Sequence, residues 1–140
     1  SPMIEIVEGL KPTHALRIAP QKGLAEITPD HLYNAAQAGP AWTALRDGVP
    51  FAVGGHAPAW HGRTILWGHI GADSGADGLF MMTRRIRMEL DRLEHDRVEA
   101  YVARNHEAGH RWIKLLGFQK EGYMRKFAHG VDYTLYAKVR

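Results

Sequence analysis

The sequence predicts an α/β (α+β) fold with a mixed central sheet of about seven strands. Seven segments show the alternation or the apolar run of β-strands, and four others show the spacing or the turn signals of helices. A strand, a glycine-rich turn, a long amphipathic helix and another strand follow one another at residues 63–103. That succession is typical of a βαβ crossover between parallel strands. The predicted element order is therefore β-α-α-β-β-β-α-β-α-β-β.

The first half of the chain combines two short helices with three strands. Thr28 is placed to cap the second helix, with Pro29 at its first helical position. Asp47-Gly48 is a strong hairpin turn, and Pro50 indicates an edge strand or the start of a strand. The expected elements are a strand at 3–7, helices at 11–19 and from 28 to Gly39, strands at 41–46 and 49–54, and a loop at 56–62.

The second half contains the crossover and a closing hairpin. Residues 63–70 form a continuous apolar run, which predicts a strand buried on both faces. One face of the long helix carries Leu79, Thr83, Ile86, Leu90 and Leu93. Gly117 is expected to end the last helix. The expected elements are a strand at 63–70, a helix at about 76–95, a strand at 97–103, a helix at 106–116, and strands at 119–128 and 131–139.

Composition restricts the class of function. The chain has 140 residues, so we expect one domain at residues 3–140, with Ser1-Pro2 as a remnant of expression. It has no cysteine, which excludes disulfides, thiolate zinc sites and a cysteine nucleophile. The net charge of +3 suits an anionic partner, but the basic residues form no block typical of a nucleic-acid tail. No signal peptide or membrane-length apolar run is evident, so we expect a cytoplasmic protein.

The segment RNHEAGHRWIKLLGF, at residues 104–118, follows a strand, starts a helix after Asn105 and ends it with Leu116-Gly117-Phe118. Together with the element order and with Asp132-Tyr133 in the last strand, it resembles the final βα unit of the GCN5-related N-acetyltransferase (GNAT) superfamily. The run HRWIKLLGF also resembles GNAT-related proteins of tailed phages, including the internal core protein of short-tailed phages. The resemblance implies a GNAT-like sheet in a cytoplasmic enzyme or, for the phage branch, in a virion component.

The GNAT resemblance implies acetyl-CoA as a substrate and an amine as the acyl acceptor. A helix N-terminus can bind phosphate through its free N–H groups, and the turn at residues 71–76 precedes such an N-terminus. In the family, the pantetheine pairs with backbone around residues 67–70, and an asparagine position at the start of the last helix falls on Asn105 or His106. The cofactor-binding residues implied are Trp67, Ile70, Gly71, Ser74, Gly75, Ala76, Asn105 and His106.

Two features depart from the family pattern. The Q/R-x-x-G-x-G/A phosphate signature is absent, and Asp73 and Asp77 bring negative charge to the turn. A helix cap formed by Ser74 or Asp73 is an equally good interpretation of this turn. In addition, the position of the family's proton-donating tyrosine falls on Ile113. A non-catalytic phage relative, acting as an internal virion or interaction protein, accommodates both departures.

The catalytic candidates are one histidine and one tyrosine. His69 ends the central strand, and an unperturbed imidazole pKa near neutrality suits a base that deprotonates an amine. Tyr101 or Tyr123 could replace the missing acid, and we take Tyr101 as the candidate. The alternative for each of these side chains is a structural residue with a satisfied hydrogen bond. The last hairpin, if exposed, also offers an edge for a homodimer.

A competing motif lies within the same segment. His106-Glu107-Ala108-Gly109-His110 matches the H-E-x-x-H signature of zinc hydrolases, in which two histidines bind zinc and the glutamate acts on the metal-bound water. Such a site needs a third ligand, and the residues that follow His110 supply none at the expected spacing. We therefore expect no metal, and we expect the two histidines to be solvated on the helix surface.

Overall fold

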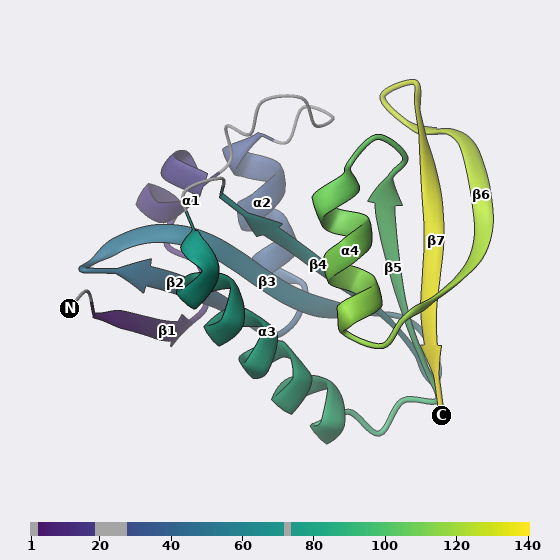
Figure 1. Cartoon of the computed structure of the whole chain (residues 1–140), viewed down its shortest axis with the longest axis horizontal. Coiled ribbons are helices and arrows are strands. Elements are labelled where there is room, and N and C mark those ends of the chain that lie inside the picture. The colour runs from purple at the N-terminus through teal and green to yellow at the C-terminus, as the bar shows by residue number, and fades with distance from the viewer. Residues whose placement is uncertain (1–2, 19–27, 72–73) are drawn as a thin grey trace.

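The computed structural model describes residues 3–18, 28–71 and 74–140. They form a single seven-stranded sheet with helices on both faces (Figure 1). The elements are β1 (Ile4–Glu8), α1 (Pro12–Ile18), α2 (Pro29–Gln37), β2 (Ala41–Arg46), β3 (Val49–Trp60), β4 (Arg63–Ile70), α3 (Gly75–Arg92), β5 (Arg97–Ala103), α4 (Glu107–Leu115), β6 (Gln119–Ala128) and β7 (Val131–Val139). The predicted class, strand number and element order are confirmed.

The strands lie in the order β1-β2-β3-β4-β5-β7-β6. All neighbouring pairs are antiparallel except β4 and β5, which run parallel at the centre of the sheet. The intervening helix α3 is therefore the crossover of the predicted βαβ unit. The closing hairpin is also confirmed, with β7 inside the sheet and β6 at its edge.

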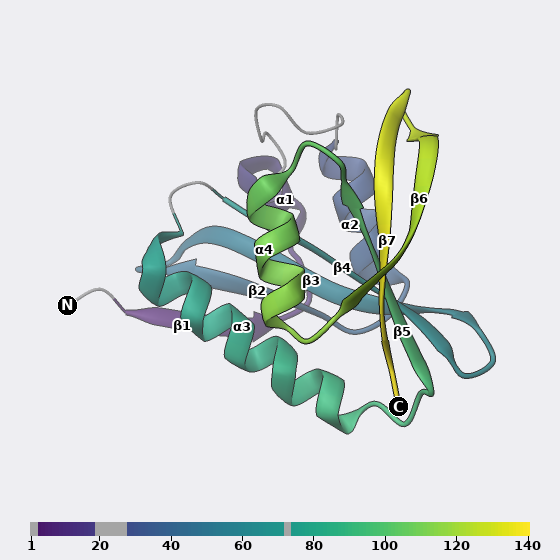
Figure 2. The ribbon, with the colours of Figure 1, turned by 45° about the vertical axis from the view of Figure 1, so that its right-hand side comes forward.

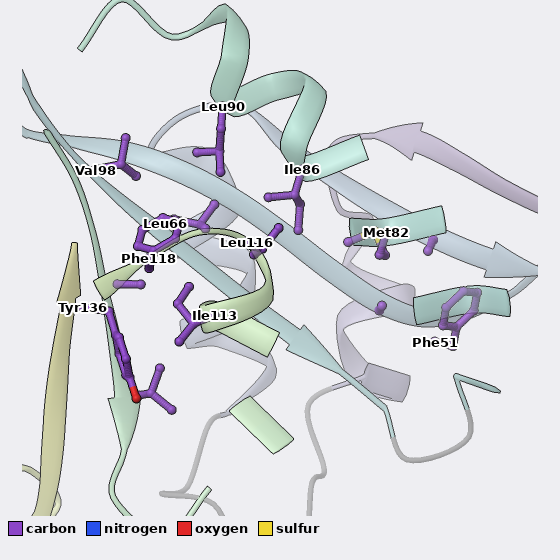
Figure 3. Close-up of a cluster of buried hydrophobic side chains, with 14 residues drawn as sticks. Phe51, Leu66, Met82, Ile86, Leu90, Val98, Ile113, Leu116, Phe118 and Tyr136 are labelled. Atoms are coloured by element: carbon purple, nitrogen blue, oxygen red, sulfur yellow. The ribbon is translucent and has the colours of Figure 1, made fainter. Parts of the chain in front are cut away.

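Each face of the sheet has its own apolar cluster. On one face α3 and α4 cover the larger cluster, which contains Met82 and Ile86 from α3, Ile113 from α4 and the ring of Tyr136 from β7 (Figure 3). On the other face α1 and α2 pack on β3 around Val53. Thr83, Ile86 and Leu90 of the predicted α3 face are buried, and the unpredicted Met82 is completely buried beside them.

The predicted loop at residues 56–62 is wrong. β3 continues to Trp60 and pairs with β4 over this stretch, so that the two strands form a long hairpin (Figure 2). Pro58 is tolerated because the pairing register shifts between Pro58 and Trp60, where the ladder needs no regular N–H donor. Only His61 and Gly62 form the turn, and Gly62 has a positive φ of 73°.

Residues 63–70 were predicted to be buried on both faces, but only two of them are fully buried. Thr64 and Leu66 are buried against α3, whereas the last four residues of β4 are only half-buried. The cause is the sheet itself, because β5 leaves the side of β4 after three paired residues. No helix in the described ranges is long and apolar enough to cross a membrane.

Candidate functional site

The two central strands separate after a short paired stretch. β4 and β5 pair at three positions, the last of which joins Ile65 to Glu99. Beyond this point β4 continues along β3 to Ile70, whereas β5 continues along β7 to Ala103. Residues 66–69 therefore present a backbone edge that pairs with no strand in the described part of the chain. Such an edge can form main-chain hydrogen bonds with an extended ligand.

Three candidate side chains lie on one face of the sheet at this opening. Residues opposite one another in a parallel pair share a face, so Trp67 and His69 lie on the same face as Glu99 and Tyr101. Trp67 packs against the cluster beneath α1 and α2. Its indole Nε1 is buried and has no hydrogen-bond partner among the described residues. An unpaired buried donor costs about 1–3 kcal/mol, so a ligand or water that accepts from this N–H would be favoured.

The His69 imidazole is held in its neutral form. Burial lowers the pKa of His69 to about 4, and the nearby charge of His106 lowers it further in the same direction. The ring is therefore unprotonated at pH 7 and has a nitrogen able to accept a proton. An ideal general base has a pKa near the working pH, and the pKa of His69 lies well below it. His69 would therefore be a weak base that passes the proton quickly to solvent.

This low pKa predicts a pH-dependent loss of stability. Between pH 6.5 and about 4 the unfolded chain protonates this histidine while the folded chain does not, so the free energy of unfolding falls as the pH falls. We expect His69 to contribute a loss of about 3 kcal/mol across this window. Urea unfolding of the wild type and of His69→Gln at several pH values measures the difference, because the other histidines are common to both. Parallel stability curves would show that His69 titrates normally in the fold.

The Tyr101 hydroxyl donates a hydrogen bond to Glu99 Oε2 at 2.9 Å. Burial and then this hydrogen bond raise the pKa of Tyr101, so its proton is retained at neutral pH. The ring contacts Phe127, with centroids 5.1 Å apart, and Phe127 in turn contacts Tyr133 at 5.4 Å. Tyr101 is thus a proton-carrying group in an aromatic lining that joins β5 to the end of the β6–β7 hairpin.

Tyr123, the other candidate acid, lies on the edge strand β6. Its hydroxyl donates to Asp132 Oδ2 at 2.8 Å, and Arg104 donates to the same hydroxyl. The side chain is half exposed, and its ring also receives the Arg104 guanidinium at 5.1 Å. The geometry therefore favours Tyr101 over Tyr123 as the tyrosine of the opening.

The phosphate turn contains a charge pair that the sequence did not reveal. Ala72 and Asp73 lie outside the described residues, and Gly71, Ser74, Gly75 and Ala76 lead into α3. Asp77 in the first turn of α3 is paired with Arg46 from the end of β2, at 2.8 and 3.0 Å. These bonds, with one from the Gly78 N–H, lower the pKa of Asp77 to about 2.

Arg46 also donates to the Ser74 carbonyl at 2.6 Å. It therefore brings a guanidinium to the start of α3, although it lies 31 residues away from Asp77 in sequence. The helix-cap interpretation of Ser74 is correct only in position, because its side chain forms no cap hydrogen bond within the described structure. Gly75 has a φ of 70°, and a Cβ there would meet Asp77 Oδ1 at 2.9 Å, so glycine is required for this close approach.

The histidines of the zinc signature have other contacts. His110 Nε2 lies 3.0 Å from the carbonyl oxygens of Ala103 and Arg104, and Nδ1 lies 2.7 Å from the Tyr136 hydroxyl. Because carbonyls only accept, Nε2 carries the proton and Nδ1 accepts from Tyr136. Both nitrogens are thus engaged, and no group of three or more ligands is arranged for a metal among the described residues. The geometry gives the zinc alternative no support, and His110 is a structural residue, not a solvated one.

The two remaining cofactor candidates lie at the start of α4, where His106 is near enough to His69 to affect its pKa. Asn105 is exposed just beyond β5. The His106 ring folds over its own helix, where a Cβ on Gly109 would meet it at 2.4 Å, so Gly109 makes room for that ring. Burial and then His110 lower the pKa of His106. Further along α4, Trp112 donates from Nε1 to Thr83 Oγ1 of α3 at 2.8 Å. Its ring also packs over Gly68 of β4, so it connects α3, α4 and β4.

Comparison with known proteins places this geometry in a structural class. No family model and no curated protein matches the sequence. Solved structures, however, match along the whole chain. The ribosomal-protein-S18-alanine N-acetyltransferase from Escherichia coli matches with a TM-score of 0.78 at 14% identity, over 98% of this chain and 94% of that one. The ribosomal-protein-S5-alanine acetyltransferase from Vibrio fischeri gives 0.69 at 14%, over 99% and 96%.

A third match is a Salmonella typhimurium protein assigned as an acetyltransferase and solved with its cofactor acetyl-CoA. Its TM-score is 0.71 at 15% identity, over 97% of this chain and 93% of that one. The chain has the GNAT acetyltransferase fold. At these identities the likeness establishes the fold alone, and none of these three structures connects the chain to the phage branch of the GNAT resemblance.

The GNAT fold brings most of the predicted site residues to one place. Trp67, His69 and Ile70 line one side of the strand opening, and Tyr101 lies across it on β5. The start of α3 follows β4 directly. Sequence reasoning missed Arg46 and Glu99, because their partners come from other elements of the fold. Arg46 pairs with Asp77, and Glu99 pairs with Arg63. Glu99 alone had a signal, since Arg97, Glu99 and Tyr101 alternate along one predicted strand face.

Proposed function

We propose that this protein is an acetyl-CoA-dependent N-acyltransferase that transfers an acetyl group to an amine. The observation that carries the proposal is the opening between β4 and β5, where the neutral imidazole of His69 and the hydroxyl of Tyr101 share a face. The GNAT fold supports the same activity, because the matched structures are described as acetyltransferases.

Most residues at the opening fit acetyl-CoA. Residues 66–69 offer an unpaired backbone edge to the pantetheine, and Asn105 and His106 follow the end of β5. Gly71, Ser74, Gly75 and Ala76 would hold the pyrophosphate at the start of α3. When bound, acetyl-CoA supplies the acetyl group as a reactive thioester. The exception to the fit is the Asp77 carboxylate, whose charge Arg46 offsets.

The residues of the chain would manage the protons of the transfer. The amine nitrogen forms a bond to the thioester carbonyl carbon, the C–S bond breaks and the amine loses a proton. A ring nitrogen of His69 accepts this proton, because the ring is neutral at pH 7. Tyr101 is the candidate that gives a proton to the departing sulfur; its hydroxyl donates to Glu99 in the structure, so the O–H would have to rotate towards the sulfur for this step.

Calorimetry with acetyl-CoA, followed by an assay of CoA release with a panel of amines, tests the proposal. We expect saturable binding and amine-dependent release of CoA. An absence of binding heat at millimolar acetyl-CoA would contradict the enzymatic assignment. Tyr101→Phe tests the acid separately, since it removes the hydroxyl and retains the ring that contacts Phe127.

Asp77 provides a prediction about affinity. Asp77→Asn removes a negative charge from the start of α3 and leaves the Arg46 guanidinium there, so we expect acetyl-CoA to bind about threefold to tenfold more tightly. Arg46→Gln should weaken binding. Asp91→Asn, at the other end of the same helix, is the matched control and should leave the dissociation constant unchanged. Weaker binding by Asp77→Asn would mean that the carboxylate is needed to shape the turn.

A second candidate function is a non-catalytic role for the same fold. Two observations favour it, namely the Asp77 carboxylate at the phosphate position and the buried Ile113 at the position of the family's acid. This candidate requires that the protein bind no acetyl-CoA and form a stable complex with itself or another protein. The calorimetric experiment therefore separates the two functions directly.

A further inference from the structure

A depression with an excess of positive charge lies at the end of β5, beside the proposed site. It is lined by Arg104, Asn105, Lys126, Gly130, Val131 and Asp132, and Arg125 joins Lys126 and Asp132 around an adjoining hollow. Among these described residues, three cationic side chains face one carboxylate. Arg104, Arg125 and Lys126 are all exposed, so their charges are accessible to a ligand.

The single carboxylate of the depression is already engaged. Asp132 Oδ1 accepts the Lys126 backbone N–H at 2.8 Å, and Oδ2 accepts the Tyr123 hydroxyl at 2.8 Å. Arg104 Nη1 approaches the same Oδ2 at 3.8 Å. These hydrogen bonds, first that of Lys126 and then that of Tyr123, lower the pKa of Asp132. Asp132 therefore holds the walls of the depression in place, and the cationic excess remains for a ligand.

The backbone of β6 is distorted at this point. The register of β6 against β7 shifts between Met124 and Ala128, and Lys126 adopts a positive φ of 47°. A left-handed conformation is unfavourable for lysine and persists only where surrounding contacts hold it, as the bond from its N–H to Asp132 does here. Strain of this kind gathers at binding sites, and here it places Arg125 and Lys126 at the depression.

The depression lies at the same end of the sheet as the proposed catalytic opening. Phe127 follows Lys126 and contacts the ring of Tyr101, and Asn105 precedes His106, whose charge lowers the pKa of His69. The end of β5 and the β6–β7 turn lie together at one end of the sheet (Figure 1). A ligand bound by the cations at this end of the sheet therefore lies beside the opening that carries His69.

We propose that the acyl acceptor is a small amine that carries an anionic group, a carboxylate or a phosphate, which Arg104 and Lys126 bind in this depression. This inference rests on the proposed acetyl transfer and names the class of its acceptor. Charge-assisted hydrogen bonds from guanidinium and ammonium groups to such anions are the strong ones in proteins.

Matched acceptors that differ in one charge test the inference. Phosphoethanolamine is compared with ethanolamine, and β-alanine with its amide, by kcat/KM for CoA release. We expect the anionic member of each pair to be at least about tenfold better, and we expect Arg104→Gln and Lys126→Gln to bring the ratio towards one. Lys120→Gln, which removes a charge from the opposite end of β6, should keep the ratio. Equal or better turnover of the neutral members would overturn the inference.

A binding measurement keeps the inference testable without turnover. Backbone amide shifts of Asn105, Lys126 and Val131 are followed by NMR during titration with phosphoethanolamine, β-alanine and inorganic phosphate. Saturable shifts that disappear in the Arg104→Gln/Lys126→Gln double variant support the anion site even if no amine is acetylated, in which case the proposed function alone fails. An absence of shifts, or acetylation confined to peptides, overturns the inference, and the comparison of phosphate with carboxylate ligands identifies the preferred anion.

Discussion

Replacing His69 with alanine is expected to lower kcat for acetyl transfer about 100-fold at pH 7, the lower end of the usual contribution of a general base, because its pKa of about 4 lies below the working pH. The ring is neutral at this pH and lies on the face of the opening that carries Tyr101. Because β4 would offer the same backbone to the pantetheine in the variant, the dissociation constant for acetyl-CoA should change by less than about threefold. Steady-state CoA release gives kcat, and calorimetry gives the dissociation constant.

The pH profile distinguishes a base from a merely structural histidine. Since the pKa of His69 is about 4, the wild type should show no loss of the base near pH 6.5, and its rate should rise with pH as more of the amine is deprotonated. His31→Ala, an exposed histidine on α2, serves as the matched control and should retain full activity. If His69→Ala keeps more than about a third of kcat, another group or solvent takes the proton and the assignment is wrong.

The fold was predictable because its signals are local. The alternation of the strands, the face of α3 with Thr83 and Leu90, and Gly117 with its φ of 92° at the end of α4 each depend on neighbouring residues. The extension of β3 was missed because Pro58 and the glycines around it are typical of a loop. Pairing with β4 and a register shift overrode this local preference, and that outcome depends on a strand that comes later in the chain.

The site was only partly predictable, since its decisive contacts join distant segments. His69 and Tyr101 followed from strand ends and alternation, but the separation of β4 from β5 is a property of the assembled sheet. The pair of Arg46 with Asp77 joins β2 to α3, and neither residue has a neighbour in sequence that indicates the other. The zinc motif is the opposite case, since its local spacing is correct but the fold uses the residues differently. Both nitrogens of His110 form hydrogen bonds within the protein.

The buried carboxylate of Glu99 accounts for the second large effect that we expect. Glu99 is 6% exposed, accepts hydrogen bonds from Arg97 at 2.8 Å and from the Tyr101 hydroxyl, and forms an ion pair with Arg63 at 2.9 Å. Burial acts to raise the pKa of Glu99, but the bonds from Arg97 and Tyr101 and the charge of Arg63 outweigh it, so the net pKa is lowered. The folded state therefore depends on these partners to keep a charge inside the sheet.

Arg97→Met is expected to lower the free energy of unfolding by about 1.5–3 kcal/mol at pH 7, because it retains the apolar stem but removes one charged partner of Glu99, while Arg63 and Tyr101 remain. The bond from Arg97 to Glu121 on β6, at 2.6 Å, is lost as well. Arg92→Met, which removes an exposed guanidinium 3.5 Å from Glu89, should cost less than about 1 kcal/mol and is the matched control. Urea unfolding monitored by circular dichroism measures both.

The double variant Arg97→Met/Glu99→Gln should be more stable than Arg97→Met alone, since it removes the buried charge together with its partner. It should still impair catalysis, because the Tyr101 hydroxyl then donates to a neutral amide in place of a carboxylate. A double variant as unstable as the single one would mean that Arg97 stabilises the sheet through Glu121 and not through Glu99. Recovery of stability without recovery of kcat would instead indicate that the ion pair beneath Tyr101 serves the proton donor as well as the fold.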